Sequence, residues 1–385
     1  MAFFPVIVPT RIVYDKSLKP NSPKSLGGRN ERFNMNKLTI IFATLFLAAL
    51  GWVLSHSIPL SGAFATLEPK LVKQCRKVEI APGTEDVTID EGRNGAFVSA
   101  ADRRAWYNDN GASDVNPSNG IYFLSFDQDN SVRKVSPEMN GFLPHGLYLW
   151  KGGEQDRMFV VNHPPSGEEI IEIFDVAANG DLTHADSISF TEMHSPNDVV
   201  GVGSRSFYAT NDRGFETGIM ATLEAYLTLP FSSIVYFDGE NGEVIKDGMF
   251  YANGINQSAD GSEIYIAEIL KRRIGIFDRD IESGALTRSK TIRVATAPDN
   301  IEVANDGALW TAGHSKIFDF IAHAKDPAAI APSHAIRIDP ETGATSDEFI
   351  SIRGEINGSS VAAANDTTLL VGAVFDSHVM ICPRG

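Results

Sequence analysis

One two-strand unit occurs six times between residues 95 and 382 of this 385-residue chain. In each copy, a short β-type run that ends in small or polar residues is followed by a second run, which often ends in an aromatic residue and Asp. No long helical periodicity is present in this region, so the pattern predicts an all-β fold. The six pairs of runs are 95–100 with 120–127, 157–163 with 171–176, 206–212 with 233–238, 263–268 with 273–278, 308–313 with 335–339, and 368–374 with 378–382.

A shorter element precedes most copies. It reads Pro-His-Gly at 144–146, Pro-Asn-Asp at 196–198, Ala-Asn-Gly at 252–254 and Pro-Asp-Asn at 298–300, with Glu-Asp at 85–86 and a degenerate Asn-Gly-Ser at 357–359. A repeat of roughly 55 residues built from short strands is typical of β-propeller blades. We therefore expect a six-bladed propeller over residues 70–385, in which these elements begin the innermost strands and converge on one end of the channel.

Ring closure provides a check on this prediction. The chain ends just after the third strand of the sixth copy, so the fourth strand has to come from elsewhere, and residues 70–80 are available. That pairing would bring Cys75 near Cys382, the two cysteines of the chain. A disulfide there would constrain the unfolded chain by roughly 4–5 kcal/mol; the alternative is two unpaired thiols.

An uncharged apolar run at residues 38–54 precedes the propeller. It is at the short limit of a membrane-spanning helix, and it follows a basic segment, residues 1–37, with seven Lys and Arg against two acidic residues. The positive-inside rule predicts a signal-anchor with a cytosolic tail, a linker at 55–69, and a lumenal or extracellular propeller. A cleaved signal peptide with a site near residues 63–65, and hence a secreted protein, is the alternative. Met35 is an alternative start.

The formal net charge of −16 makes nucleic acid a poor choice of partner. Export would permit glycosylation at the sequons of Asn256, Asn357 and Asn365.

The converging elements are rich in oxygen ligands. They contribute Glu85, Asp86, His145, Asn197, Asp198, Asn253, Asp299 and Asn300. Carboxylate and amide oxygens suit Ca²⁺, whereas zinc prefers His and Cys. Single Asn-Asp pairs are usually plain turn formers, but their recurrence at one phase of four repeats favours a metal site.

Two histidines complete the predicted site. His145 begins the second blade, and His163 ends the next strand in Val-Asn-His-Pro. One histidine oriented by another can take a proton from water near neutral pH. No G-x-S-x-G, H-E-x-x-H, phosphate loop or dinucleotide motif is present. Metal-assisted attack by water is the chemistry that remains.

These segments resemble the serum paraoxonase/arylesterase family of six-bladed propellers. The resemblance runs from about Cys75 to Cys382 and is carried, in order, by residues 83–86, 144–146, 160–164, 197–203, 207–212, 252–256, 264–268 and 299–301. Arg213 and Gly214 depart from the family pattern, which has a histidine and an aromatic residue there, and Gly313 replaces a cysteine.

The resemblance implies two calcium ions. The catalytic ion would be held by Glu85, Asn197, Asn253, Asp299 and Asn300, and the structural ion by Asp86, Asp198 and the backbone carbonyl of Leu147. It also implies a catalytic dyad of His145 with His163, a Cys75–Cys382 disulfide, and pocket-wall positions at Tyr251, His314 and Phe318.

We therefore predict a calcium-dependent hydrolase of lactones and aryl esters, with His145 or alternatively Asp299 as the base. Two alternatives stay open: a gluconolactonase-like propeller with one metal, and a non-catalytic exported scaffold similar to strictosidine-synthase-like propellers. The pattern predicts neither an oligomeric state nor a particular substrate.

Overall fold

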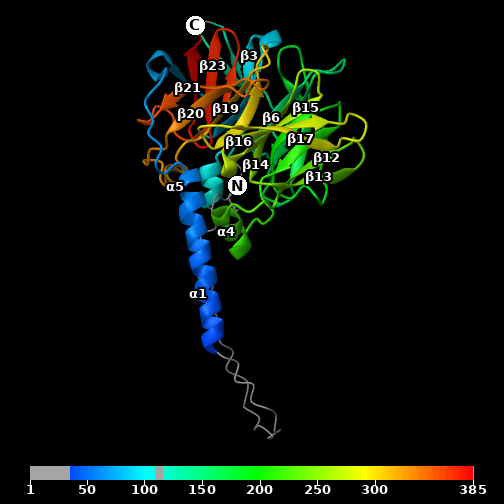
Figure 1. The fold of residues 1–385 in the computed structure, drawn as a ribbon. Coiled ribbons are helices and arrows are strands. Elements are labelled where there is room, and N and C mark those ends of the chain that lie inside the picture. Colours follow the sequence, from blue (N-terminus) through cyan, green and yellow to red (C-terminus); the bar gives the residue numbers. More distant parts are fainter. Residues whose placement is uncertain (1–34, 109–115, 128, 385) are drawn as a thin grey trace, which may run out of the picture.

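The computed structural model describes residues 35–108, 116–127 and 129–384. Six four-stranded antiparallel sheets surround a central axis (Figure 1), which confirms the predicted propeller. The predicted basic tail lies outside the described residues except for residues 35–37.

Each blade runs from its innermost to its outermost strand in chain order, apart from the sixth. The first two blades comprise β2 (Thr84–Asp90), β3 (Gly95–Ala100), β4 (Gly120–Ser125) and β5 (Val132–Lys134), then β6 (Pro144–Trp150), β7 (Arg157–Asn162), β8 (Ile170–Val176) and β9 (Leu182–Ile188). The next two comprise β10 (Pro196–Gly201), β11 (Phe207–Asn211), β12 (Ser232–Phe237) and β13 (Gly242–Met249), then β14 (Ala252–Gln257), β15 (Glu263–Glu268), β16 (Arg273–Arg279) and β17 (Leu286–Arg293). The fifth comprises β18 (Pro298–Val303), β19 (Leu309–His314), β20 (Ser333–Ile338) and β21 (Thr345–Ser351), and the sixth β22 (Ser359–Ala364), β23 (Thr368–Ala373), β24 (His378–Pro383) and β1 (Arg76–Glu79).

The sixth blade closes the ring as predicted. Its outer strand is β1, which pairs with β24 from Arg76 opposite Ile381 to Glu79 opposite His378. The Cys75–Cys382 disulfide joins the same two segments across a sequence separation of 307 residues. The first and last strands of the propeller are therefore held together by backbone hydrogen bonds and by a covalent bond.

Apolar clusters fill the seams between neighbouring blades. At the seam of the second and third blades, Phe159, Phe207 and Phe237 pack with their rings in contact. Fully burying such a side chain contributes about 1.5–3 kcal/mol. The innermost strands β10 and β22 are buried along their whole length, whereas in the outer strand β13 only one residue, Met249, is buried. This gradient explains why the inner strands lack a simple apolar–polar alternation.

Short helices in three blades were not predicted. They are α3 (Arg103–Asn108), α4 (Gly218–Leu227) and α5 (Ile317–Lys325), and each connects the second strand of a blade to the third. Because the strands are antiparallel, these connections lie at the end where the innermost strands begin. Single 3₁₀ turns occur at Val72–Gln74, Glu91–Arg93 and Ile269–Lys271.

The N-terminal helix extends beyond the apolar run at 38–54. α1 (Met35–Trp52) continues through a π-helical turn (Val53–Ser57) into α2 (Ile58–Leu60). Within the described part of the chain, Thr39–Leu60 is the one helix long and apolar enough to cross a membrane, with a mean hydropathy of 1.8. Its role as a signal-anchor stays a prediction.

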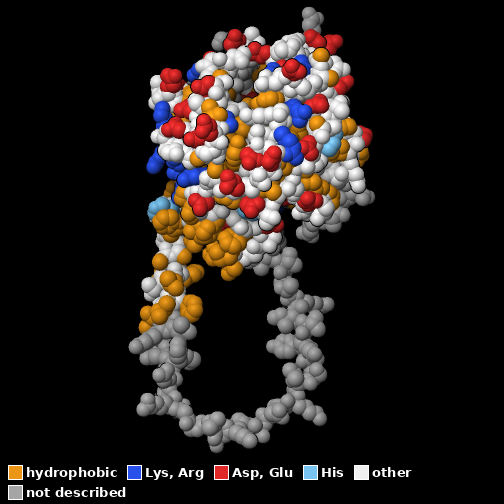
Figure 2. Space-filling model, turned by 90° about the vertical axis from the view of Figure 1, so that its right-hand side faces the viewer, with side chains coloured by type: hydrophobic (Ala, Val, Ile, Leu, Met, Phe, Trp, Pro, Cys, Tyr) orange, Lys and Arg blue, Asp and Glu red, His pale blue; other side chains and the backbone are white. Residues whose placement is uncertain are grey.

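The helix joins the propeller beside α4 and α5. Trp52 Nε1 donates to Leu227 O at 2.9 Å, and Ser57 Oγ donates to Tyr226 O at 2.6 Å. Ile317 N donates to Ser61 O at 2.9 Å. Hydrophobic side chains gather at this end of the propeller (Figure 2).

The three sequons differ in exposure. Asn256 is buried, and its Nδ2 donates to Ile301 O at 2.8 Å. Asn357 and Asn365 are half-buried, and Asn365 lies in the turn between β22 and β23. Glycosylation stays a prediction for the latter two, whereas the folded protein has no room for a glycan at Asn256.

Candidate functional site

The recurring sequence element forms the same irregularity in every blade. The pairing of each innermost strand with its neighbour shifts register there, as between Pro196 and Val199 or between Pro298 and Ile301. The same shift occurs in the other four blades. A β-bulge removes residues from the regular ladder and redirects their side chains. The bulges explain why the element recurs at one phase.

The bulged segments contact one another around the channel. Asp86 Oδ2 accepts from Leu147 N at 2.8 Å, which joins the first blade to the second. Asp198 Oδ2 accepts from Ile255 N at 2.8 Å, which joins the third to the fourth.

Two glycines allow the bulged segments of neighbouring blades to lie close to each other. A Cβ at Gly146 would lie 2.3 Å from Asp198 Oδ1, and a Cβ at Gly254 would lie 2.5 Å from Asn300 Cα. Asn300 Nδ2 donates to Glu85 Oε1 at 2.9 Å, which connects the fifth blade to the first. Residues far apart in the sequence therefore meet as predicted.

Five of the predicted ligands form what we call the amide–carboxylate cluster: Glu85, Asn197, Asn253, Asp299 and Asn300. All five are buried. Asn253 Oδ1, Asp299 Oδ1 and Asn300 Oδ1 accept no hydrogen bond, and neither does Glu85 Oε2. Buried acceptor oxygens are normally paired, so these atoms fit a bound cation.

Burial and neighbouring charges perturb the two acids of this cluster. Burial alone would raise the pKa of Glu85, but His145, Arg103 and Asn300 outweigh it and lower that pKa to about 2. Burial raises the pKa of Asp299 to about 6, although His314 opposes the shift. The cluster therefore contains one carboxylate that stays charged and one that readily takes a proton when no cation is near.

Asp86 and Asp198 form a second group, the aspartate pair. Asp86 Oδ1 accepts from Val87 N at 2.9 Å, and Asp198 Oδ1 accepts from Val199 N at 2.8 Å. Burial raises both pKa values well above the ordinary range, and the charge of Glu85 adds to the effect on Asp86 as that of Asp86 does on Asp198. Two interacting buried carboxylates need a proton or a cation.

The donor set indicates the kind of cation. Within residues 35–108, 116–127 and 129–384, no three His, Cys, Asp or Glu side chains are placed to hold a metal ion together. The amide–carboxylate cluster instead offers two carboxylates and three side-chain amides. A mixed carboxylate and amide set suits a hard cation such as Ca²⁺ rather than zinc.

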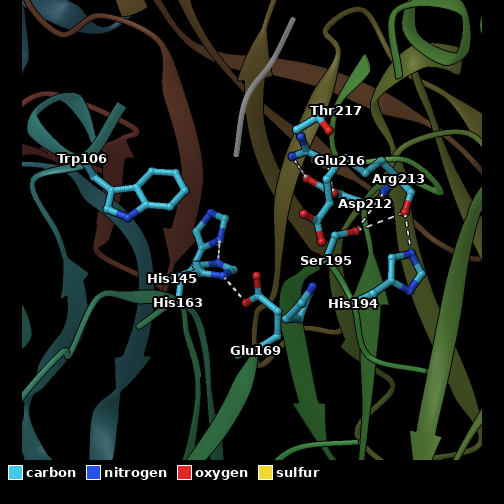
Figure 3. Close-up of a pocket in the computed structure, with 11 residues that line it drawn as sticks. Trp106, His145, His163, Glu169, His194, Ser195, Asp212, Arg213, Glu216 and Thr217 are labelled. Carbon is cyan, nitrogen blue, oxygen red and sulfur yellow. Dashed lines mark hydrogen bonds and ion pairs between the residues drawn. The ribbon is translucent and has the colours of Figure 1, made fainter. Parts of the chain in front are cut away.

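The two predicted histidines are in contact (Figure 3). His145 Nδ1 lies 3.0 Å from His163 Nε2, and His145 Nε2 lies 3.5 Å from Glu85 Oε1. The segments that carry them are held together, because Leu143 N donates to Asn162 Oδ1 at 2.9 Å. Burial lowers the pKa of His145 to about 4 despite the opposing effect of Glu85, so this imidazole is neutral at pH 7.

A cavity of about 160 Å³ adjoins the histidine pair. Trp106 from α3 lines it on one side, and Asp212 and Arg213, which follow β11, line it on the other (Figure 3). Arg213, which departs from the family pattern, donates from Nε and Nη2 to the two carboxylate oxygens of Asp212, both at 2.8 Å.

Two residues of the site were missed from the sequence. Glu169 Oε2 lies 2.5 Å from His163 Nδ1. Buried Arg103 donates from Nη2 to Pro144 O at 2.7 Å and from Nη1 to Gly83 O at 3.0 Å, close to Glu85. No sequence pattern distinguishes Glu169 from its neighbour Glu168, or Arg103 from its neighbour Arg104.

The three predicted pocket-wall residues differ in burial, and their role in the pocket stays a prediction. Tyr251 and His314 are buried, and His314 Nε2 is 3.0 Å from Asp299 Oδ2. Phe318 is 41% exposed and lines a separate small cavity with Leu60 and Tyr226, beside the N-terminal helix.

A family model described as Arylesterase matches residues 120–382, well over half of the chain. The chain belongs to the paraoxonase/arylesterase family. Chicken (Gallus gallus) serum paraoxonase/arylesterase 2 is 34% identical over 244 residues, which cover 62% of this chain and 68% of that protein. Human serum paraoxonase/arylesterase 1 is 30% identical over 330 residues, which cover 81% and 90%.

The solved structure of a gluconolactonase from Xanthomonas campestris shares the fold of this paraoxonase/arylesterase family member. Its TM-score is 0.51 at 14% sequence identity, and the match covers 83% of this chain and 96% of that one. At this identity the likeness concerns the fold alone. The family model begins after Glu85 and Asp86, so their place in the site rests on the contacts described above.

Proposed function

We propose that the protein is a calcium-dependent hydrolase of lactones and aryl esters. Membership of the paraoxonase/arylesterase family supports an esterase or lactonase. The observation that carries the proposal is the set of buried oxygens of Asn253, Asp299 and Asn300 that accept no hydrogen bond, beside the His145–His163 contact and a cavity.

The two groups of acids would hold two ions. The amide–carboxylate cluster would hold the catalytic ion, and the aspartate pair with the carbonyl of Leu147 would hold a structural one. A calcium ion held by the amide–carboxylate cluster would supply a Lewis acid for the substrate carbonyl and for the negative charge that develops on its oxygen.

The histidines would handle the proton. His145 Nε2 takes a proton from the attacking water. His163 fixes the orientation of the His145 ring, because its Nε2 contacts Nδ1 of His145. The proton then passes from His145 to the leaving alkoxide, which in a lactone stays part of the product. Such a base contributes about 10²–10⁴-fold to the rate.

A panel of lactones and aryl esters tests the function. We expect the full-length protein to hydrolyse members of both classes with calcium, and to lose this activity when a chelator removes the metal. Hydrolysis that persists after complete removal of calcium would contradict the proposal.

His145→Gln and Asp299→Asn test the identity of the base. If His145 is the base, its substitution lowers kcat by about 10²–10⁴-fold with calcium still bound. Full turnover in His145→Gln would leave Asp299 as the base.

Counting bound calcium separates this proposal from a gluconolactonase-like enzyme. We expect two ions per chain after dialysis, whereas one would favour the single-metal alternative. Folding that is insensitive to a chelator, together with no ester hydrolysis, would favour the non-catalytic scaffold.

We also propose that residues 38–54 anchor the protein in a membrane with the propeller on the lumenal or extracellular side. The exposed apolar helix supports this topology. Protease treatment of sealed microsomes tests it, because a lumenal propeller survives until detergent is added, whereas a cytosolic propeller is degraded at once.

A further inference from the structure

Glu169 lies at the far end of the histidine pair from the metal ligands. It ends the turn between β7 and β8, directly before Ile170. Its Oε2 lies 2.5 Å from His163 Nδ1, and the two side chains are 23% and 15% exposed. A hydrogen bond between a charged carboxylate and a ring nitrogen in such a setting is short and strong.

This contact determines where the protons of the pair reside. An ionised carboxylate only accepts hydrogen bonds, so Nδ1 of His163 carries the hydrogen. When the His163 ring is neutral it has one N–H, so Nε2 of His163 is left as an acceptor. The 3.0 Å contact with that atom is then donated by Nδ1 of His145, and Nε2 of His145 has no hydrogen.

A second carboxylate favours the opposite arrangement. Glu85 Oε1 lies 3.5 Å from His145 Nε2 and would draw the hydrogen onto that atom. A proton there would occupy the nitrogen that has to receive one from water. The contact between Glu85 and His145 is longer than an ordinary hydrogen bond, whereas the contact between Glu169 and His163 is short. The tautomers that Glu169 favours are therefore the more stable ones.

We propose that Glu169 is a positioning residue, which sets the tautomers of His163 and His145 and thereby keeps Nε2 of His145 free to accept a proton. This inference rests on the proposed role of the histidine pair. It adds an acid to the relay that neither the sequence pattern nor the family resemblance predicted.

Three variants of the calcium-loaded full-length protein test it. Glu169→Ala removes the acceptor, and we expect kcat to fall by about 10–100-fold while KM changes by less than about 2-fold. Glu169→Gln keeps an oxygen that can accept from Nδ1, so kcat should fall by less than about 10-fold. Glu168→Ala is the matched control, because that side chain is exposed, and it should behave as the unchanged protein does.

Histidine ¹⁵N NMR of the same proteins provides a readout that loss of packing would not mimic. In the unchanged protein, both His145 and His163 should carry hydrogen on Nδ1. In Glu169→Ala, the hydrogen of His145 should move to Nε2. The same tautomer in both proteins, or a kcat of Glu169→Ala equal to that of Glu168→Ala, would overturn the inference.

The outcome for His145→Gln separates this inference from the proposed function. If His145→Gln is inactive and Glu169→Ala is fully active, the assignment of His145 as the base holds and only the proposed role of Glu169 is wrong. If His145→Gln retains full turnover, the base assignment fails and the role of Glu169 fails with it.

Discussion

The amide–carboxylate cluster and the aspartate pair are built from neighbouring residues but differ in how their oxygens are used. Each carboxylate oxygen of Asp86 and Asp198 accepts a backbone N–H. Oxygens of Asn253, Asp299 and Asn300, by contrast, accept none. The aspartate pair is thus hydrogen-bonded to the backbone of the strands. The amide–carboxylate cluster has oxygens available for an ion and lies beside the two histidines.

This contrast indicates that the position of a residue within the bulge, rather than its type, determines whether its oxygens accept backbone N–H groups or are available to an ion. Glu85 and Asp86 are adjacent acids, yet one faces His145 and the other bonds to the next strand. Substitutions in the cluster should therefore change activity more than stability, and those in the pair should do the reverse.

The largest effect is expected in the cluster. Asn253→Ala removes a proposed ligand whose side-chain atoms make no hydrogen bond, so the fold loses little. We expect kcat/KM for a lactone to fall by about 1000-fold and calcium affinity to fall with it. Kinetics and thermal melting at saturating calcium check this. A large fall in melting temperature with near-normal kcat would reverse the contrast.

Asp198→Ala should act mainly on stability. It leaves the buried amides of Val199 and Ile255 without acceptors, at about 1–3 kcal/mol each. We expect the free energy of unfolding to fall by at least about 2 kcal/mol in denaturant titrations. Activity measured well below the melting temperature should stay within about tenfold of normal. Unchanged stability would show that the pair is not a structural element.

Thr210 lies between the two groups. Its Oγ1 donates to Asn253 O at 2.6 Å and accepts from Asp198 N at 3.1 Å. Thr210→Val keeps the shape but removes both bonds, so stability should fall by about 1–2 kcal/mol and kcat by less than tenfold. An effect on only one of the two quantities would show that the groups are not coupled through this residue.

The smallest expected effect is a pH dependence of calcium stabilisation. Because burial raises the pKa of Asp299 from 3.8 to about 6, its proton stabilises the calcium-free fold at low pH, and this stabilisation is lost as pH rises through 6. Calcium would replace the proton. The rise in melting temperature on adding calcium should therefore be larger at pH 7.5 than at pH 5, and an equal rise at both would contradict this.

The sequence predicted the fold because the fold is a repeat. Six copies at one phase defined the blades, and the incomplete sixth copy predicted both the closing strand and the Cys75–Cys382 disulfide. The recurring elements likewise predicted which oxygens meet, since each begins an innermost strand.

Residues outside the repeat could not be predicted in this way. Arg103 lies in a connection between strands, and its contacts with Gly83 and Pro144 depend on how that connection packs. Glu169 follows another glutamate in a Pro- and Gly-containing turn, and only the path of the backbone selects it. Phe318, on α5, lines a small cavity beside the N-terminal helix, and its role in the pocket wall stays a prediction.

A crystal structure of the full-length protein at saturating calcium tests the central claim most directly. The account predicts an ion about 2.3–2.6 Å from the side-chain oxygens of the amide–carboxylate cluster, namely Glu85, Asn197, Asn253, Asp299 and Asn300. Electron density with no ion there, and with those side chains paired to one another or to water, would contradict it.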